Sequence, residues 1–297
     1  MVMKPALTIG EQINLLKRRG LIVEDDAERL RLTRLLVNCN YYRLSGYWRY
    51  YQRAPHHKDD SFLPGTTVET IEKVYLFDET LRSILSDGLS ILEVGVRSRV
   101  AYVMGTKMSP AAYLVPSTYS SETATRPGGR AVRLRDTLLE DIQRELERSR
   151  EQFIAHHRER GEDPPVWAAI EALSFGTVSK MYRLLLDEDV RHEVARMFDL
   201  KPEHLESILR GFSVLRNVCA HHGRVWNRKP PIPIQVPRAL KTERDSSIYH
   251  QTPWGEFVTL SWLVDRIRPV CSFGDDLRVH IETYPELLDG LQHPHHR

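Results

Sequence analysis

The segment TVETIEKVYLFDETLRSILSDGLSILEVGVRSRVAYVM, residues 67–104, decides the fold. Its apolar residues recur every three or four positions, which is the spacing of one face of an α-helix. These residues are Ile71, Val74, Tyr75, Leu81, Ile84, Leu85, Leu89, Leu92 and Val96. The pattern predicts one long helix, or two helices stacked end to end, with Gly88 and Gly95 as weak points.

The same spacing continues on both sides of this segment. Thr8 and Glu11 form a capping-box pattern in front of a first amphipathic helix, which Gly20 would end. Further helices are expected over residues 24–37, 131–160, 166–176, 177–187, 189–198, 203–222, 255–268 and 275–290. Prolines and glycines predict a loop over 105–130, and KPPIPIQVP at 229–237 predicts an extended path over the surface. The sequence therefore predicts an all-α protein.

Composition excludes several classes of protein. The chain has 297 residues, 41% of them hydrophobic, and a formal net charge of +2, so it is long enough for a packed core and its charge alone indicates no partner. Three widely spaced cysteines do not suggest a disulfide framework. No apolar run is long enough for a membrane span, and the N-terminus lacks the features of a signal peptide. We expect a cytoplasmic protein with no membrane partner.

The segment FSVLRNVCAHHGRVWNR, residues 212–228, carries the candidate chemistry. In a helix, Asn217 and His221 share one face, with Arg224 three residues further on and Arg216 beside the same face. A guanidinium binds phosphate oxygens, and a neutral imidazole transfers a proton near neutral pH, so the group suits a phosphodiester. The alternative is a polar helix face whose side chains cap the helix.

Other features have both a functional and a structural interpretation. NYYRLSGYWRYY at 40–51 has six aromatic residues among twelve and could stack RNA bases through Tyr42 and Trp48, with Arg43 and Arg49 on phosphates. It could equally be a packed corner with a turn at Ser45–Gly46, which we favour.

Glu93 and Arg97, four residues apart, predict a helix-stabilising ion pair or a pair that orients Arg216. The pairs His56–His57 and His156–His157 lack the spacing and partners of a zinc site, so we expect no metal and no other cofactor.

Several strings together resemble the Abi-like abortive-infection family of bacterial phage-defence proteins, the AbiD and AbiF group, which belongs to the HEPN superfamily. They are LKRRGLIVEDD at 16–26, NYYRLSGYW at 40–48, LFDETLR at 76–82, ILEVGVRSR at 91–99, SFGTVSKMY at 174–182 and RNVCAHHGRVWNR at 216–228. The resemblance covers about residues 10–230.

This resemblance implies a HEPN-like helical bundle with an N-terminal helical extension. Many HEPN proteins are metal-independent endoribonucleases whose motif is Arg, a polar residue and then His a few positions later. In this chain the motif falls on Arg216, Asn217 and His221, with His222 and Arg224 as supporting residues. A ribose 2′-hydroxyl lies beside its own phosphate, so positioning, proton transfer and charge stabilisation are enough for cleavage.

We therefore expect three consecutive segments. Residues 1–62 are an N-terminal helical segment with an aromatic-rich corner, 63–230 are the HEPN-like bundle, and 231–297 are a Pro-rich connection with C-terminal helices packed on it. The expected function is a toxin-like ribonuclease of antiphage defence that binds RNA, forms a homodimer so that two motifs meet, and is restrained by a protein or RNA antitoxin. The alternatives are a non-catalytic RNA-binding or sensor module, or a regulatory partner of another enzyme.

Overall fold

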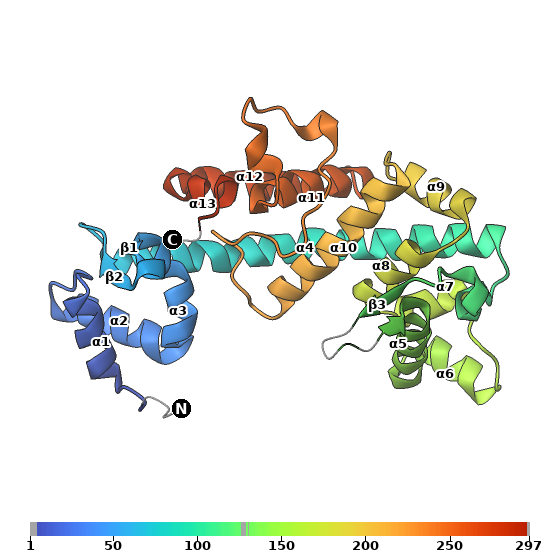
Figure 1. The fold of residues 1–297 in the computed structure, drawn as a ribbon, viewed down its shortest axis with the longest axis horizontal. Helices are drawn as coiled ribbons and strands as arrows, with labels where there is room; N and C mark the ends of the chain where they lie inside the picture. The colour runs from blue at the N-terminus through green and yellow to red at the C-terminus, as the bar shows by residue number, and fades with distance from the viewer. Residues whose placement is uncertain (1–4, 126–128, 130, 296–297) are drawn as a thin grey trace. The chain divides into compact units, whose positions relative to one another are not determined.

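The computed structural model describes residues 5–125, 129 and 131–295, and these are mostly α-helical (Figure 1). The α-helices are α1 (Ile9–Arg18), α2 (Asp26–Cys39), α3 (Tyr41–Trp48), α4 (Val68–Lys107), α5 (Leu134–Arg148), α6 (Gln152–Glu159), α7 (Val166–Ala169), α8 (Phe175–Leu184), α9 (Glu188–Arg196), α10 (Pro202–Ala220), α11 (Pro253–Ile267), α12 (Phe273–Thr283) and α13 (Leu288–Gln292). Two antiparallel hairpins complete the regular structure: β1 (Gln52–Ala54) with β2 (Asp59–Phe62), and β3 (Thr123–Thr125) with β4 (Ala131–Arg133). The predicted all-α class is confirmed.

Short 3₁₀ helices connect several of these elements. They lie at Arg49–Tyr51, Pro55–His57, Ala112–Leu114, Pro116–Thr118, Ile170–Ala172, Arg238–Leu240, Ser246–Tyr249 and Pro285–Leu287.

The chain divides into two compact units, each assembled from segments that are distant in sequence. Unit 1 comprises Met1–Leu85, Val218–Lys229 and Asp276–Arg297, and unit 2 comprises Ser86–Asn217 and Pro230–Asp275. Helices α4 and α10 each begin in one unit and end in the other. The division into residues 1–62, 63–230 and 231–297 that we expect from the sequence stays a prediction.

Unit 1 begins with the predicted capping box. The Thr8 side chain accepts a hydrogen bond from the Glu11 amide, and the Glu11 carboxylate accepts one from the Thr8 amide at 2.7 Å. Helices α1 and α2 bury their apolar faces, with Leu16 and Leu32 at most 1% exposed. The hairpin β1–β2 follows α3.

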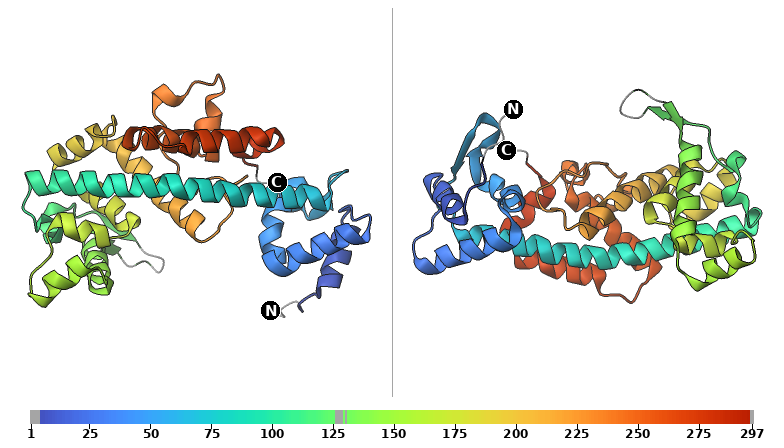
Figure 2. Two further views of the ribbon diagram at one scale, coloured as in Figure 1. Left: turned by 180° about the vertical axis from the view of Figure 1, so that it is seen from behind. Right: turned by 90° about the horizontal axis from the view of Figure 1, so that it is seen from below.

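The apolar spacing predicted one long helix or two helices stacked end to end, and α4 is one helix that runs unbroken through Gly88 and Gly95. The glycines serve close packing in unit 2 instead. A Cβ atom on Gly88 would lie 2.4 Å from the Phe273 ring, and one on Gly95 would lie 2.9 Å from Ile267. Figures 1 and 2 show α11, which ends at Ile267, lying along α4.

The single helix expected over 131–160 is instead two helices, α5 and α6, separated at Ser149. Ser149 has an extended backbone with φ −65° and ψ 135°, which ends α5. An Nη atom of Arg158 donates hydrogen bonds to the carbonyl oxygens of Leu146, Glu147 and Ser149. Arg158 on α6 therefore caps carbonyls at the C-terminal end of α5.

The proline-rich segment after α10 has no helix or strand, as its four prolines predicted. It does not simply run over the surface, however, because Ile234 and Val236 are buried. A Cβ atom on Gly211 would clash with Ile234, and the Gln235 amide donates to the Ser207 hydroxyl at 2.9 Å. The segment therefore covers one face of α10 in unit 2.

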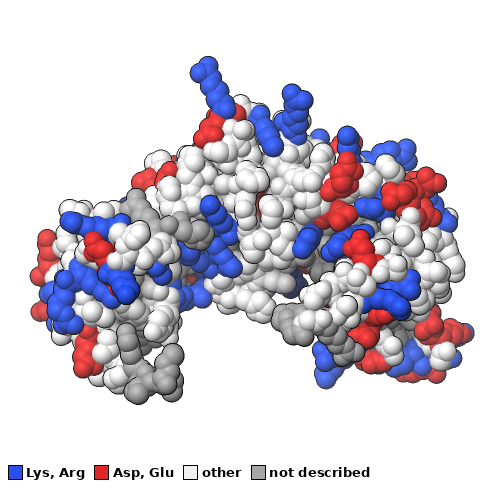
Figure 3. All heavy atoms as spheres, in the orientation of Figure 1, with Lys and Arg blue, Asp and Glu red and all other residues white. Residues whose placement is uncertain are grey.

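Basic and acidic side chains are interspersed on the molecular face drawn in Figure 3. None of the helices in the described part of the chain combines the length and the apolar character needed to cross a bilayer.

Candidate active site

The candidate motif lies at the C-terminal end of helix α10. The helix was predicted over 203–222 and is observed over Pro202–Ala220, so His221 is the first residue beyond it. The Gly223 amide donates to the Val218 carbonyl at 2.7 Å, and the His222 amide donates to the Cys219 carbonyl at 3.0 Å. With His222 in the left-handed region at φ 53°, these bonds form a Schellman cap. The end of the helix is therefore fixed in position by backbone hydrogen bonds.

Three motif side chains are solvent-exposed: Arg216, Asn217 and His221. An Nη atom of Arg216 donates to the Asn217 Oδ1 atom at 3.5 Å, and Nε of Arg216 lies 3.4 Å from Glu93 Oε2. The Arg216 side chain is 46% exposed, so its guanidinium is accessible from solvent while Nε lies against Glu93. This is the arrangement that an anion-binding arginine requires.

Glu93 connects this arginine to the interior of unit 2. Its carboxylate is buried, 7% exposed, and its Oε1 atom lies 2.6 Å from an Nη atom of Arg97. The same Nη atom of Arg97 donates to the Leu173 carbonyl at 2.8 Å. The structure thus brings together Glu93, Arg97 and Arg216, and the carboxylate lies between two guanidinium groups. A buried carboxylate with two cationic partners is fixed in position, so it can orient Arg216.

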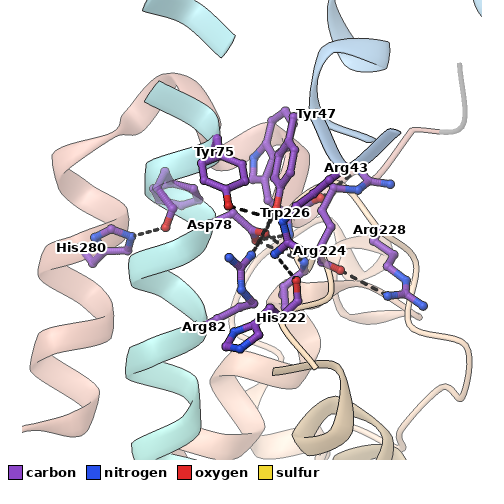
Figure 4. Close-up of polar contacts among 12 residues, drawn as sticks. Arg43, Tyr47, Tyr75, Asp78, Arg82, His222, Arg224, Trp226, Arg228 and His280 are labelled. Atoms are coloured by element: carbon purple, nitrogen blue, oxygen red, sulfur yellow. Dashed lines mark hydrogen bonds and ion pairs between the residues drawn. The ribbon is translucent and has the colours of Figure 1, made fainter. Parts of the chain in front are cut away.

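A second buried carboxylate, Asp78, anchors the loop that follows α10 in unit 1 (Figure 4). Asp78 is fully buried and accepts hydrogen bonds from the Tyr47 hydroxyl at 2.7 Å and from the amides of Trp226 at 2.7 Å and Val225 at 3.2 Å. It also forms an ion pair with Arg82. Burial raises the pKa of Asp78, while Arg82 and the hydrogen-bond donors act in the opposite direction. Burial and the neighbouring Asp78 raise the pKa of the Tyr47 hydroxyl.

Two arginines hold the same loop from other directions. An Nη atom of Arg224 donates to the carbonyls of Trp226 at 3.0 Å and Asn227 at 2.8 Å. Burial lowers the pKa of the Arg224 guanidinium. An Nη atom of Arg43 on α3 donates to the carbonyl of His222. The loop after His221 is therefore anchored by residues of both α3 and α4.

The turn expected at Ser45–Gly46 in the aromatic-rich stretch is wrong, because this part of the stretch is the helix α3. Residues Ser45 and Gly46 lie inside α3, and the glycine is explained by packing, because a Cβ atom there would lie 3.3 Å from Nε of Arg224. Trp48 is 1% exposed and packs edge-on against Tyr41, so its faces are not available to a base. Tyr42 is 85% exposed, and Arg49 is exposed as well.

The model of the Abi-like protein family matches residues 34–227. The chain belongs to the Abi-like protein family. No curated protein and no solved structure matches it. In this Abi-like protein the matched region includes Arg43, Asp78, Glu93, Arg216 and His221, so both buried carboxylates and the helix-end motif lie within it.

Sequence reasoning missed the Asp78 cluster of this Abi-like protein. A signal was present, because Asp78 and Arg82 are an acid and an arginine four residues apart on a predominantly apolar helix, as are Glu93 and Arg97. A charged pair on the apolar face of a helix is buried only where it has partners. Periodicity could not show that those partners come from residues 225 and 226, far along the chain.

Metal-ligating side chains do not cluster in the described part of this Abi-like protein. In the ranges 5–125, 129 and 131–295, no group of three or more His, Cys, Asp and Glu side chains is placed to hold a metal ion. His56 and His57 lie in the connection between β1 and β2, and His156 and His157 lie in α6.

Proposed function

We propose that this Abi-like protein is a metal-independent endoribonuclease of the HEPN type that acts as a toxin in bacterial antiphage abortive infection. The observation that carries the proposal is the pairing of Arg216 with the buried Glu93, at 3.4 Å, one helical turn before the exposed His221. This provides an oriented cation and a proton-transfer group on one helix end. Membership of the Abi-like family and the resemblance of the motif to HEPN ribonucleases support the same function.

The proposed reaction uses the 2′-hydroxyl of the substrate as nucleophile. Its oxygen attacks the adjacent phosphorus, the bond from phosphorus to the 5′-oxygen breaks, and a proton passes from the 2′-hydroxyl to a base while the 5′-oxygen receives one. His221 supplies general acid or base catalysis, and Arg216 stabilises the charge on the phosphate oxygens. Asn217 bonds to Arg216 and helps to orient it. The products are a 2′,3′-cyclic phosphate and a 5′-hydroxyl.

A homodimer completes this proposal. One chain offers a single Arg216–His221 motif, whereas a base and an acid on opposite sides of one phosphate call for two groups. A two-fold interface would supply the second copy. A toxin of this kind also needs a restraining antitoxin, either protein or RNA.

The second candidate is a non-catalytic RNA-binding or sensor module. It is favoured by the exposed Tyr42 ring on α3, which is 85% accessible. An exposed aromatic face stacks a base of single-stranded RNA without cutting the strand. In that case the histidine of the motif would be dispensable.

The test is cleavage of end-labelled RNA by the purified chain in EDTA, with the product ends identified. We expect cyclic or 3′-phosphate ends and 5′-hydroxyl ends, with DNA of the same sequence left intact. His221→Ala should slow cleavage by roughly 10²-fold or more, and Arg216→Ala comparably. Matched controls are His156→Ala and His250→Ala, which remove exposed histidines elsewhere and should change little.

Loss of cleavage in EDTA, or a wild-type rate for a correctly folded His221→Ala chain, would exclude this mechanism. RNA binding without any cleavage by the parent chain would support the second candidate.

A further inference from the structure

A small cavity in unit 1 lies beside the loop that carries His221. Its volume is about 150 Å³, and its walls are formed by Gly46, Arg49, Tyr50, His56, Arg224, Asn227 and His295. Sites for drug-sized ligands span roughly 300–1,000 Å³, so this cavity takes a group of a few heavy atoms and not a whole nucleoside. Its walls combine α3, the segment after α3, and the loop after α10.

The lining consists largely of hydrogen-bond donors. Arg224 uses one Nη atom for the Trp226 and Asn227 carbonyls, and its Nε and second Nη atoms make no hydrogen bond to any described residue. Across residues 5–125, 129 and 131–295, Arg49 and His56 have no side-chain partner and the Nδ2 atom of Asn227 has none either. Two guanidinium groups, an amide and an imidazole are therefore available to one acceptor-rich group.

Among the described residues, no carboxylate forms an ion pair with Arg49 or Arg224. No carboxylate of the described residues lines the cavity. Asp289, which contacts its wall, accepts hydrogen bonds from Tyr50 at 2.9 Å and from His295 at 3.1 Å. Burial lowers the pKa of Arg224, Asp78 opposes this, and the neighbouring cations Arg228 and Arg49 lower it further. A bound anion would relieve this repulsion.

The surroundings extend the positive charge. Figure 4 shows Arg43, Arg224 and Arg228 on one side of α4, with His280 on the other. None of the three arginines forms an ion pair with a carboxylate of the described ranges, whereas Arg183, for example, pairs with Glu122 at 2.8 Å. Arg49 and Arg224 line the cavity without a carboxylate ion pair, and guanidinium groups of this kind bind phosphate oxygens.

We infer that this cavity binds one phosphate group of an RNA strand, next to the phosphate that is cut. Arg224 lies three residues after His221 on an anchored loop, which sets the cavity close to the candidate catalytic histidine. Arg49 and Arg224 bind the phosphate oxygens, and Asn227 and His56 donate further hydrogen bonds. The inference rests on the proposed function for the identity of the polymer.

The experiment measures binding without cleavage. A fluorescent 2′-O-methyl RNA cannot undergo 2′-hydroxyl attack, so the full wild-type chain can be titrated with it. Arg49→Gln should raise the Kd for RNA about 10-fold, because a charged hydrogen bond is lost. It should also make the slope of the logarithm of the binding constant against the logarithm of the salt concentration shallower by about 0.7, because one phosphate contact is lost. The matched control is Arg53→Gln, which removes an equally exposed arginine that does not line the cavity and should change Kd less than about 2-fold.

Inorganic phosphate, substituted for chloride at constant ionic strength, identifies the site. It should weaken RNA binding by the wild type and by Arg53→Gln, and have no such effect on Arg49→Gln. RNAs with a 5′-phosphate or a 5′-hydroxyl distinguish the two sources of the phosphate. Equal affinity indicates a backbone phosphodiester, and at least about 10-fold tighter binding of the 5′-phosphate form indicates a terminal phosphate.

His56→Gln provides a second variant with a smaller change in the same direction. Equal effects of Arg49→Gln and Arg53→Gln, or no RNA binding by the wild type, would overturn the inference. Wild-type RNA affinity in Arg49→Gln with cleavage intact would overturn it while leaving the proposed function standing. Binding that depends on Arg49, with no cleavage under any condition, would support the cavity and contradict the proposed function.

Discussion

The Oε2 atom of Glu93 lies 3.4 Å from Nε of Arg216, while the Oε1 atom of the same carboxylate lies 2.6 Å from an Nη atom of Arg97. Glu93 is buried and Arg216 is half exposed, so the fixed partner is the carboxylate. The buried Glu93 carboxylate therefore determines the position of the exposed Arg216 guanidinium.

Glu93→Gln should reduce the rate of RNA cleavage by roughly 10- to 100-fold, mainly in kcat, because Arg216 loses its orienting charge but remains present. The matched control is Glu79→Gln, which changes an exposed glutamate of the same helix and should leave the rate unchanged. Single-turnover kinetics at saturating RNA measure the effect. A fall in affinity with an unchanged kcat would mean that Glu93 does not position Arg216 for the chemical step.

Asp78→Asn should lower the free energy of unfolding by about 3 kcal/mol, because Arg82 is 4% exposed and would lose its carboxylate partner. Urea denaturation followed by circular dichroism measures this change. Asp87→Asn, at an exposed position of the same helix, should alter stability by less than about 0.5 kcal/mol. Similar values for the two variants would show that the buried cluster does not stabilise the fold.

Gly88→Ala should destabilise the chain by about 1–3 kcal/mol, although alanine is the better helix former, since its Cβ would lie 2.4 Å from the Phe273 ring. Gly10→Ala is the control, and it should change stability in the opposite direction. Gly10 lies in α1, and a Cβ atom there would meet no described atom within 4 Å, so alanine should stabilise by up to about 1 kcal/mol. Thermal melts of both variants measure the change in stability. They show whether packing or helix propensity determines the effect of alanine at position 88.

Light scattering of the purified chain should give twice the 34.5 kDa mass of one chain. The two-fold arrangement would bring two copies of His221 across the axis. A mass of 34.5 kDa at every usable concentration, together with RNA cleavage, would remove the argument for a composite site.

Helix positions were predictable where one apolar stripe continues without interruption, as in α4 and α10. The break at Ser149 was not predictable from the apolar pattern. The end of α5 is capped by a hydrogen bond from Arg158 to the Leu146 carbonyl, and the apolar pattern does not indicate this contact. Likewise, α3 contains Ser45–Gly46, a pair that locally favours a turn, and tertiary packing on Arg224 determines the outcome. Local sequence does not encode contacts of this kind.

In the candidate site, too, some features were predictable from the sequence and others were not. The spacing of Arg216, Asn217 and His221 could be read from the sequence because four or five residues span about one turn of helix. The ion pair between Glu93 and Arg97 was predictable for the same reason, and its contact with Arg216 was one of two interpretations. The amides of Val225 and Trp226 bind Asp78 from about 150 residues away, a pairing that no local spacing indicates.

The Schellman cap places two adjacent histidines under different constraints. His222 occupies left-handed backbone space, which Gly and Asn tolerate and β-branched residues do not. His221 has no such restriction, and its ring is exposed. In saturation mutagenesis, position 222 should therefore accept residues that tolerate a left-handed backbone. Position 221 should accept only residues whose side chain can transfer a proton. The two neighbouring positions should then accept different sets of residues.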